Sequence, residues 1–350
     1  MSIRNRKLQR CARAGLALAV AASASMIALT AMAADPDWLD KKLLEAAKKD
    51  TGTVNVYSST NEGEGLPLWK IFTDATGIKV NYVRGSDSQL FARINIEQRA
   101  GKQEWDLMQI TGLQKLPKSM LHQFQPPQAK NLRPEAQDPE HRWYGMYANY
   151  NAPGYNTKLV KASDLPKTFE DFLKHPEWKG KVAIDFSDNE WLKAMFVHYG
   201  EKKGRELVAN LVKVLKPAVT KGHLAMARSV GAGEYAIELN QYVNLTLNVK
   251  LAGQPIDFWV MDPVAVFYGQ VAVNEKSARR NAAVLAENFA LSKEAQAFLS
   301  KFGRIPTRDD VPTNPPGVLD AFKGHKIIPT LLTGKEDQQW QKTFKELFQQ

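Results

Sequence analysis

The sequence predicts an α/β fold in which mainly parallel sheets are flanked by helices, and three observations support this. Short stretches of alternating apolar residues take turns with stretches whose apolar residues recur at helical spacing. Ser, Thr, Asn and Asp residues, which cap helix N-termini, directly follow the strand-like stretches. The 317 residues from Ala34 to Gln350 are enough for a large core in two lobes. Strand, helix and strand at this spacing favour right-handed crossovers and a mainly parallel sheet.

The first part of the chain shows the clearest alternation of elements. In order, we expect a helix at 38–47, a strand at 53–57, a helix at 65–75 closed by Gly77, a strand at 79–83, a helix carrying Leu90, Ile94 and Ile96, and a strand at 105–109. Leu66, Leu68, Trp69 and Phe72 would face inward from the helix at 65–75. The polar segments 58–61 and 84–89 connect strand ends to helix starts. Loops of this kind gather along one edge of a parallel sheet, where ligands bind.

The second part of the chain repeats this alternation after proline-rich connections around Pro126 and 134–139. In order, we expect a helix near 168–173, a strand at 181–185, a long helix opened by 186–191, strands at 235–239 and 256–260, a turn at Asp262-Pro263, and a helical C-terminus from Asn281 onward. The chain therefore predicts two α/β units.

The N-terminus has the composition of a cleaved export signal over residues 1–33. Basic residues up to Arg13 precede an alanine-rich apolar stretch, and the triplet Ala31-Met32-Ala33 predicts cleavage before Ala34. A membrane anchor is the alternative, but the stretch is shorter than the ~20 strongly apolar residues of a spanning helix. The single cysteine, Cys11, lies within the predicted signal. We therefore expect a periplasmic protein with neither a lipid anchor nor a disulfide.

The charge pattern gives no support to a nucleic-acid partner. The formal net charge is +10, and removal of the basic residues ahead of Ala34 would leave +5, from 42 basic and 37 acidic residues. The remaining Lys and Arg residues are spread among acids, with no basic run and no aromatic-basic motif. We expect no nucleic-acid binding.

Catalytic and cofactor motifs are missing from the sequence. It contains no G-x-S-x-G elbow, no H-E-x-x-H, no Walker loop and no G-x-G-x-x-G after a strand. Its six histidines, at 122, 141, 175, 198, 223 and 325, have no metal-ligand spacing. We therefore expect a binding protein with no catalytic residue, no resident metal and no cofactor. A periplasmic hydrolase or transferase is the alternative from another class.

Nine segments, in this order, resemble a known family of binding proteins. They are 54–57, 76–80, 89–94, 105–107, 155–159, 176–181, 231–235, 262–263 and 303–306. The ordered set resembles family 1 extracellular solute-binding proteins, in particular the branch that contains the periplasmic ferric-ion-binding proteins.

The resemblance implies a two-lobed periplasmic-binding-protein fold of type II, in which each lobe is a mainly parallel sheet flanked by helices. The chain would cross between lobes near 147–150 and 258–263, so that lobe 1 comprises 35–148 plus 259–350 and lobe 2 comprises 149–258. It also implies a monomeric ABC-importer component that captures a small molecule between the lobes, closes by hinge motion and docks on a membrane permease. A binding protein that signals to a sensor would use the same fold and stays an alternative.

The residues at the family's iron positions argue against iron. Ferric members hold the metal with a tyrosine pair, and many add a histidine from the first loop and a glutamate after the third strand. Here the pair position is Tyr242-Val243, the histidine position is Asn61 and the glutamate position is at or near Thr111. Fe(III) prefers anionic oxygen ligands, so one phenol, an amide and a hydroxyl make a poor set.

The residues that the resemblance places in the cleft suit a small organic anion. Three of the cleft loops precede predicted helices, whose free N–H groups favour an anion. Arg84 could meet a carboxylate or phosphonate beside backbone donors. The candidate contacts are Ser58, Ser59, Thr60, Asn61, Arg84, Gly85, Ser86, Asp87, Thr111, Ser187, Asp188, Asn189, Trp191, Gln241 and Tyr242.

For two of these residues and for the solute there are alternatives. We expect Trp191 and Tyr242 to stack on the ligand, but such aromatic side chains can also be core residues. A polyamine would suit the same cleft if Asp87, Asp188, Glu190 and Asp262 line it.

Overall fold

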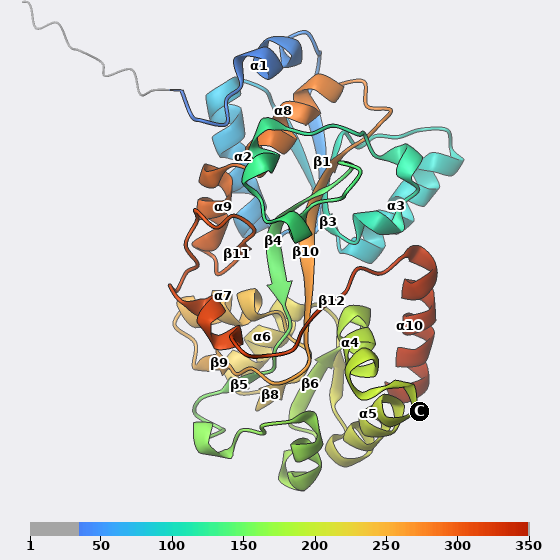
Figure 1. The fold of residues 1–350 in the computed structure, drawn as a ribbon, viewed down its shortest axis with the longest axis vertical. Helices are drawn as coiled ribbons and strands as arrows, with labels where there is room; N and C mark the ends of the chain where they lie inside the picture. Colours follow the sequence, from blue (N-terminus) through green and yellow to red (C-terminus); the bar gives the residue numbers. More distant parts are fainter. Residues whose placement is uncertain (1–34, 349–350) are drawn as a thin grey trace, which may run out of the picture. The chain divides into compact units, whose positions relative to one another are not determined.

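The computed structural model describes residues 35–348, and the predicted signal peptide at 1–33 lies outside the described residues. Within the described range, two β-sheets organise the chain from Pro36 onward, and helices pack around both (Figure 1). The helices are α1 (Lys41–Ala47), α2 (Glu62–Thr76), α3 (Asp87–Arg99), α4 (Asn189–Tyr199), α5 (Glu201–Leu215), α6 (His223–Ala232), α7 (Val243–Leu251), α8 (Arg280–Ala290), α9 (Lys293–Ser300) and α10 (Gly334–Phe348). None of the helices in the described residues is long and apolar enough to span a membrane.

The first sheet has the strand order β11-β4-β10-β3-β1-β2, and β12 pairs with β10 outside this path. Its strands are β1 (Val54–Ser58), β2 (Val80–Arg84), β3 (Leu107–Thr111), β4 (Tyr144–Tyr150), β10 (Val264–Val273), β11 (Ile305–Pro306) and β12 (Ile327–Pro329). β1 runs parallel to β2 and β3, as the alternation of strands and helices predicts. β10 is antiparallel to β3 and β4, so the sheet is mixed.

The helix α2 shows how local sequence and packing together define an element of the first lobe. It ends at Gly77, whose φ of 75° is the left-handed conformation of a glycine C-cap, as predicted. Trp69 and Phe72 are buried, and their rings pack against Phe289 of α8 with centroid distances of 5.8 and 5.6 Å. Leu66 was predicted to face inward, but it is 53% exposed and lies on the outer face.

The second sheet has the order β7-β6-β8-β5-β9. Its strands are β5 (Gly154–Asn156), β6 (Val182–Asp185), β7 (Ala218–Thr220), β8 (Ile237–Glu238) and β9 (Ile256–Phe258). β6 is parallel to β7 and β8, whereas β5 is antiparallel to β8 and β9. Two lobes, each an α/β unit, are therefore present as predicted. Both sheets are half antiparallel because the strands next to the interlobe crossings run back along their neighbours.

The chain passes between the lobes where a strand of one sheet is followed by a strand of the other. Residues 151–153 connect β4 to β5, and residues 259–263 connect β9 to β10. A further passage at 330–333 leads from β12 in the first sheet to α10, which packs beside α4 and α5 of the second lobe (Figure 1). Phe344 and Leu347 of α10 are part of the second-lobe core.

Two expectations about the C-terminal part are wrong. The assignment of all of 259–350 to lobe 1 does not hold for α10, because its apolar face is buried against the second lobe. The region after Asn281 is not helical throughout, since β11, β12 and a 3-10 helix at Val318–Phe322 lie between α9 and α10. Prolines at 306, 312, 315, 316 and 329 prevent a continuous helix there. The helix expected near 168–173 is also a 3-10 helix, at Phe169–Lys174.

Candidate functional site

The predicted solute loops converge at the carboxyl ends of strands in both sheets. In the first sheet, β1 ends at Ser58, which pairs in register with Arg84 of β2 and Gln109 of β3. In the second sheet, β6 ends at Asp185 beside the parallel strand β8. The helices α3 and α4 begin just after β2 and β6, so their N-termini lie at the same edges. These are the edges of open α/β sheets at which ligands bind.

Asp87, the first residue of α3, ties together three loops of the first lobe. The Thr111 backbone N–H donates to Asp87 Oδ1 at 3.1 Å, and the Ser59 hydroxyl also donates to this carboxylate. Ser86 caps α3 by accepting a hydrogen bond from the Gln89 backbone N–H, and the Gln89 side chain accepts from the Ser86 N–H. Burial raises the pKa of Asp87 above its ordinary value in spite of the hydrogen bonds that favour its ionised form.

Ser58 and Thr60 belong to an internal hydrogen-bond network. Both are fully buried, and Gln109 links them, since its Oε1 accepts from Ser58 Oγ and its Nε2 donates to Thr60 Oγ1, each at 3.1 Å. The Asn61 amide donates to Glu64 at 3.1 Å. These side chains satisfy one another and shape the loop before α2.

Arg84 and Gly85 follow β2 directly. The Gly85 N–H donates to the Ser58 carbonyl at 3.1 Å, which continues the β1–β2 pairing past the strand end. The Arg84 side chain is exposed, and it makes no hydrogen bond or ion pair within residues 35–348. Its charge is nevertheless close enough to Asp87 to act against the rise of that carboxyl's pKa, which burial causes.

Asp188 caps α4 in the second lobe. Its Oδ1 accepts from the Trp191 backbone N–H at 3.0 Å, and its Oδ2 accepts from the Asn151 amide at 2.5 Å. Burial raises the pKa of Asp188 well above its ordinary value, and the neighbouring negative charge of Glu190 adds to the rise. Burial likewise raises the pKa of Glu190. Two adjacent carboxyl groups therefore share a poorly solvated helix start.

Three other predicted second-lobe contacts are used inside the protein. The Ser187 N–H and hydroxyl both donate to Asp185 Oδ1, at 2.9 and 2.5 Å, and form the turn before α4. The Asn189 amide donates to Asp337 Oδ1 of α10 at 2.9 Å. Trp191 is 1% exposed and packs edge-on against Phe169 in the second-lobe core. The expectation that Trp191 stacks on a ligand therefore does not hold, because helical periodicity turns its ring inward.

Tyr242 lies directly before α7 and is surrounded by acidic groups. Its ring stacks on His223 with centroids 3.7 Å apart and an interplanar angle of 25°. Burial raises the pKa of the Tyr242 hydroxyl well above its ordinary value, and four carboxylates raise it further. Three of these carboxylates, Asp185, Asp188 and Glu190, come from the β6–α4 turn, and the fourth, Asp87, comes from the start of α3.

Gln241 fixes the position of Tyr242 through hydrogen bonds. Its Oε1 accepts from the Tyr242 N–H at 2.7 Å, while its Nε2 donates to Glu238 Oε2 at 2.7 Å and to the His223 carbonyl at 2.9 Å. Thr246 also donates to Glu238, at 2.6 Å. Burial raises the pKa of Glu238 to about 7. Gln241 is fully buried, so its role is to position Tyr242.

His223 is a site residue that the sequence reasoning missed. It begins α6, is 7% exposed, and neither ring nitrogen makes a hydrogen bond within the described residues. Its Nε2 lies 3.5 Å from Asp185 Oδ1, and burial lowers the pKa of the imidazole. The sequence offered one signal, a glycine and a histidine immediately before a helical stretch, which places the imidazole at a helix N-terminus.

The comparison with family models identifies the chain. Residues 113–327 match the model of the bacterial extracellular solute-binding proteins. The chain belongs to this family.

Known proteins that are similar to this one include an iron uptake protein, an iron-bound protein and a periplasmic binding protein with a sugar phosphate bound. Iron uptake protein A1 of Synechocystis is 28% identical over 285 residues, which cover 75% of this chain and 77% of that protein. The iron-bound HitA of Pseudomonas aeruginosa has a TM-score of 0.71 at 21% identity, over 85% of this chain and 99% of HitA. AfuA of Actinobacillus pleuropneumoniae, with fructose-6-phosphate bound, has a TM-score of 0.73 at 19% identity, over 85% and 99% of the two chains. These neighbours establish the two-lobed fold, and the relatives are binding proteins.

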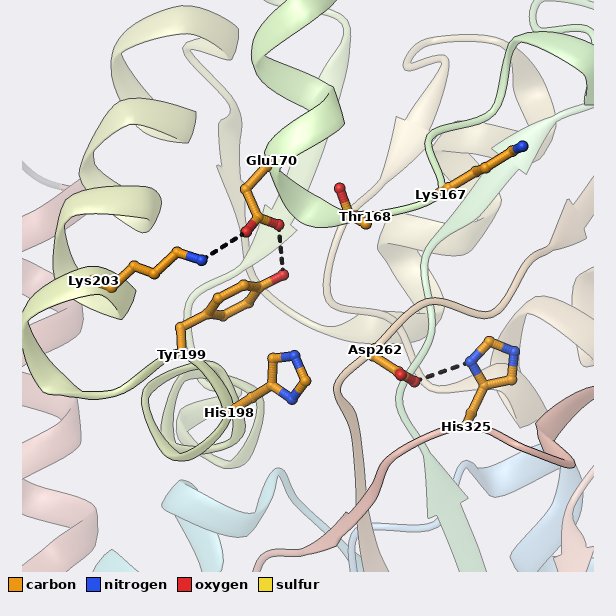
Figure 2. Close-up of a pocket in the computed structure, with 8 residues that line it drawn as sticks. All are labelled: Lys167, Thr168, Glu170, His198, Tyr199, Lys203, Asp262 and His325. Carbon is orange, nitrogen blue, oxygen red and sulfur yellow. Dashed lines mark hydrogen bonds and ion pairs between the residues drawn. The ribbon is translucent and has the colours of Figure 1, made fainter.

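A polar cavity of about 440 Å³ in this solute-binding protein is lined by second-lobe residues, by Asp262 of the passage at 259–263 and by His325 ahead of β12. Figure 2 shows Asp262 facing His325 there, with His325 Nδ1 3.0 Å from Asp262 Oδ1, and Tyr199 donating to Glu170 at 2.7 Å. Asp262 also accepts from the Lys326 N–H at 2.8 Å. It therefore does not join Asp87, Asp188 and Glu190, contrary to the expectation that all four line one cleft.

The described part of this solute-binding protein shows no complete metal site made of the usual side chains. Within residues 35–348, no three His, Cys, Asp or Glu side chains come together as a group that could hold a metal ion. Any metal in the cleft would therefore need the Tyr242 phenolate, ligands from the solute itself, or a further movement of the lobes.

Proposed function

We propose that this solute-binding protein is the periplasmic capture component of an ABC importer, that it delivers its solute to a membrane permease, and that the solute is cationic, with ferric iron as the first candidate. The observation that carries this proposal is the group of buried acidic side chains around the start of α4, Asp185, Asp188 and Glu190, which together with Asp87 of the first lobe act on the Tyr242 phenol. The similarity to an iron uptake protein supports the same choice.

The charges around Tyr242 favour a cation over an anion. Two cations, Lys115 and Arg84, act on this region, against four carboxylates. Poorly solvated carboxyl groups that repel one another are stabilised by a cation, which replaces the lost solvation of their ionised forms. An anionic solute would add a further like charge.

Ferric iron suits these donors chemically. Fe(III) is a hard cation that prefers phenolate and carboxylate oxygens. Tyr242 would supply the phenolate, and Asp87 from the first lobe with Asp188 from the second would supply carboxylates. The sequence alone gave one phenol, an amide and a hydroxyl, because Asp87 and Asp188 come from loops that the family's iron positions do not include. Ser59, Thr111 and Gln241 would orient these donors through the hydrogen bonds described above.

The test of this proposal is metal transfer to the purified protein. Fe(III) supplied as its nitrilotriacetate complex should bind tightly and produce the visible absorption band of iron-bound phenolate. Tyr242→Phe should lose the band and most of the affinity. Tyr235→Phe is the matched control and should behave as the wild type, because the Tyr235 hydroxyl belongs to the same lobe and makes no hydrogen bond within residues 35–348. If the wild-type protein takes no iron from the complex but spermidine stabilises it against heat, the solute is a polyamine and not iron.

A small organic anion is the second candidate. The helices α2 and α7 both begin without a side-chain cap, at Asn61 and Tyr242, so that their first N–H groups stay available to an anion. Arg84 is free to pair with it. If the solute is an organic anion, calorimetric titration should show binding of citrate or fructose 6-phosphate, and Arg84→Ala should weaken that binding. If neither compound gives a heat of binding, the anion is ruled out as the solute.

A further inference from the structure

One ion-pair network connects the two lobes directly. Lys115 belongs to the 3-10 helix Leu113–Lys115, which follows β3 of the first lobe. Its Nζ lies 2.7 Å from Asp337 Oδ1 of α10 and 3.4 Å from Glu190 Oε1 of α4. Both acids are therefore on helices that pack on the second lobe.

The network is buried enough to have an energetic effect. The side chains of Lys115 and Glu190 are 14% and 6% exposed, whereas Asp337 is 33% exposed. Desolvation alone would lower the pKa of Lys115, but the charges of Glu190 and Asp337 raise it above its ordinary value, so the ammonium group stays charged. A partly buried pair of this kind is screened less by solvent than a surface pair.

Each partner is fixed to its own lobe. Ahead of Lys115, the N–H groups of Gly112 and Leu113 donate to Gln270 Oε1 of β10 at 2.8 and 2.7 Å. Gly112 has a φ of 92°, and a Cβ there would lie 2.9 Å from Lys115 Cε, so the lysine chain folds over the glycine.

On the other side, Asn189 of α4 binds Asp337, and Lys193 of α4 pairs with Glu336 of α10 at 3.0 Å. The N-terminal parts of α4 and α10 therefore form one acidic surface that belongs to the second lobe. A hinge rotation that opens the cleft would move this surface away from Lys115.

We propose that Lys115 is an interlobe latch that stabilises the closed form and thereby sets the affinity for the solute. The ammonium group bridges Glu190 and Asp337 only when the lobes are together, so the network adds to the stability of the closed state and not of the open one. A solute that contacts both lobes binds in proportion to the fraction of closed protein, so this stability appears in its dissociation constant. This inference rests on the proposed closure around a solute, but not on the identity of the solute.

The experiment compares Lys115→Met with Lys118→Met. Lys118 is a nearby lysine of the same lobe whose ion pair with Glu140 is largely exposed. Small-angle scattering of the unliganded proteins should show a larger radius of gyration for Lys115→Met than for the wild type, and no change for Lys118→Met. With Fe(III) nitrilotriacetate as the probe, a tenfold loss of closed protein in Lys115→Met should raise the dissociation constant about tenfold. A lower dissociation constant would show that removal of the Lys115 charge near the carboxylates dominates, and would overturn the role of the latch in affinity.

A variant with the two charges exchanged distinguishes the interlobe ion pair from any other effect of removing Lys115. The double variant Lys115→Asp with Asp337→Lys keeps an ion pair between the lobes and should return the scattering curve toward that of the wild type. If Lys115→Met does not fold, Asp337→Asn removes the shorter contact alone and should show the same expansion to a lesser degree.

Scattering curves for Lys115→Met and Asp337→Asn that coincide with the wild type would overturn the latch. Failure of the wild type to bind the ferric probe would count against the proposed solute only, because scattering of the unliganded proteins still decides whether Lys115 holds the lobes together.

Discussion

Solute affinity should rise with pH, because the groups around Tyr242 hold protons that a cation displaces. The pKa of the Tyr242 hydroxyl is raised well above its ordinary value, first by burial and then by Asp188, Glu190, Asp185 and Asp87. At neutral pH the phenol is therefore protonated, and a metal that binds the phenolate releases one proton. Each released proton raises the association constant tenfold per pH unit, or about 1.4 kcal/mol. One proton predicts about a hundredfold gain from pH 6 to pH 8.

Further protons would steepen this dependence. Burial also raises the pKa of Asp188, and any carboxyl still protonated at the pH of measurement adds another factor of ten per unit. The assay is a titration with Fe(III) nitrilotriacetate at several pH values, and a parallel titration without protein subtracts the pH dependence of the chelator. Tyr242→Phe should reduce the slope of log K against pH by one.

The sign of the slope decides between the two candidate solutes. An anion would bind more tightly when the carboxyl groups are protonated, so its affinity would fall as pH rises. A flat or falling slope with the ferric probe would refute the reasoning from the acidic surroundings of Tyr242.

Three further predictions concern stability and are read from thermal or urea unfolding. Arg304→Met should lower the free energy of unfolding by about 3–5 kcal/mol, because it leaves the buried Glu64 carboxylate, 2.7 Å from Arg304 Nε in the native protein, without its partner. Adding Glu64→Leu should recover most of this stability, and a double variant whose two effects simply add would contradict the reasoning. Burial raises the pKa of Glu287 well above its ordinary value in the folded protein. As pH rises above the pKa of about 4.3 in the unfolded chain, the folded protein should lose about 1.4 kcal/mol of stability per pH unit relative to Glu287→Gln. A stability difference between the two proteins that does not change with pH would contradict this. Gly303→Ala should destabilise the protein by about 1–3 kcal/mol, since its φ is 85° and a Cβ would lie 2.9 Å from the Asn244 carbonyl oxygen; unchanged stability would show that this turn relaxes.

Local periodicity was sufficient to predict most elements of the first lobe. β1, α2, β2, α3 and β3 occur in the predicted order, with boundaries displaced by one to three residues. α2 begins at Glu62 instead of residue 65 because the helix continues through its first, glycine-containing turn. The lobe to which α10 belongs could not be predicted, because its amphipathic pattern indicates that one face is buried but does not indicate which lobe buries it.

The candidate site was predictable loop by loop, but not in its chemistry. The strand-end rule gave Asp87, Asp188 and Tyr242, since each follows a strand and precedes a helix. It could not show that these groups act on one another, because Asp188 and Tyr242 come from separate loops of the second lobe and Asp87 comes from the first lobe. His223 was missed because its stacking on Tyr242 joins residues from two loops of the second lobe whose contact the sequence does not show. Trp191 was misjudged because a loop position next to a helix start does not reveal on which side the ring lies.

The placement of α10 has a consequence for how the protein matures. The second-lobe core includes Phe344 and Leu347 of α10, which follows the strands of both sheets in the described chain. A chain made from its N-terminus can complete the first sheet only after β10 and β12 appear, and it can cover the second core only after α10 appears. The two cores are therefore completed by segments that come late in the chain order, so neither lobe can bury all of its apolar surface independently of the C-terminal elements.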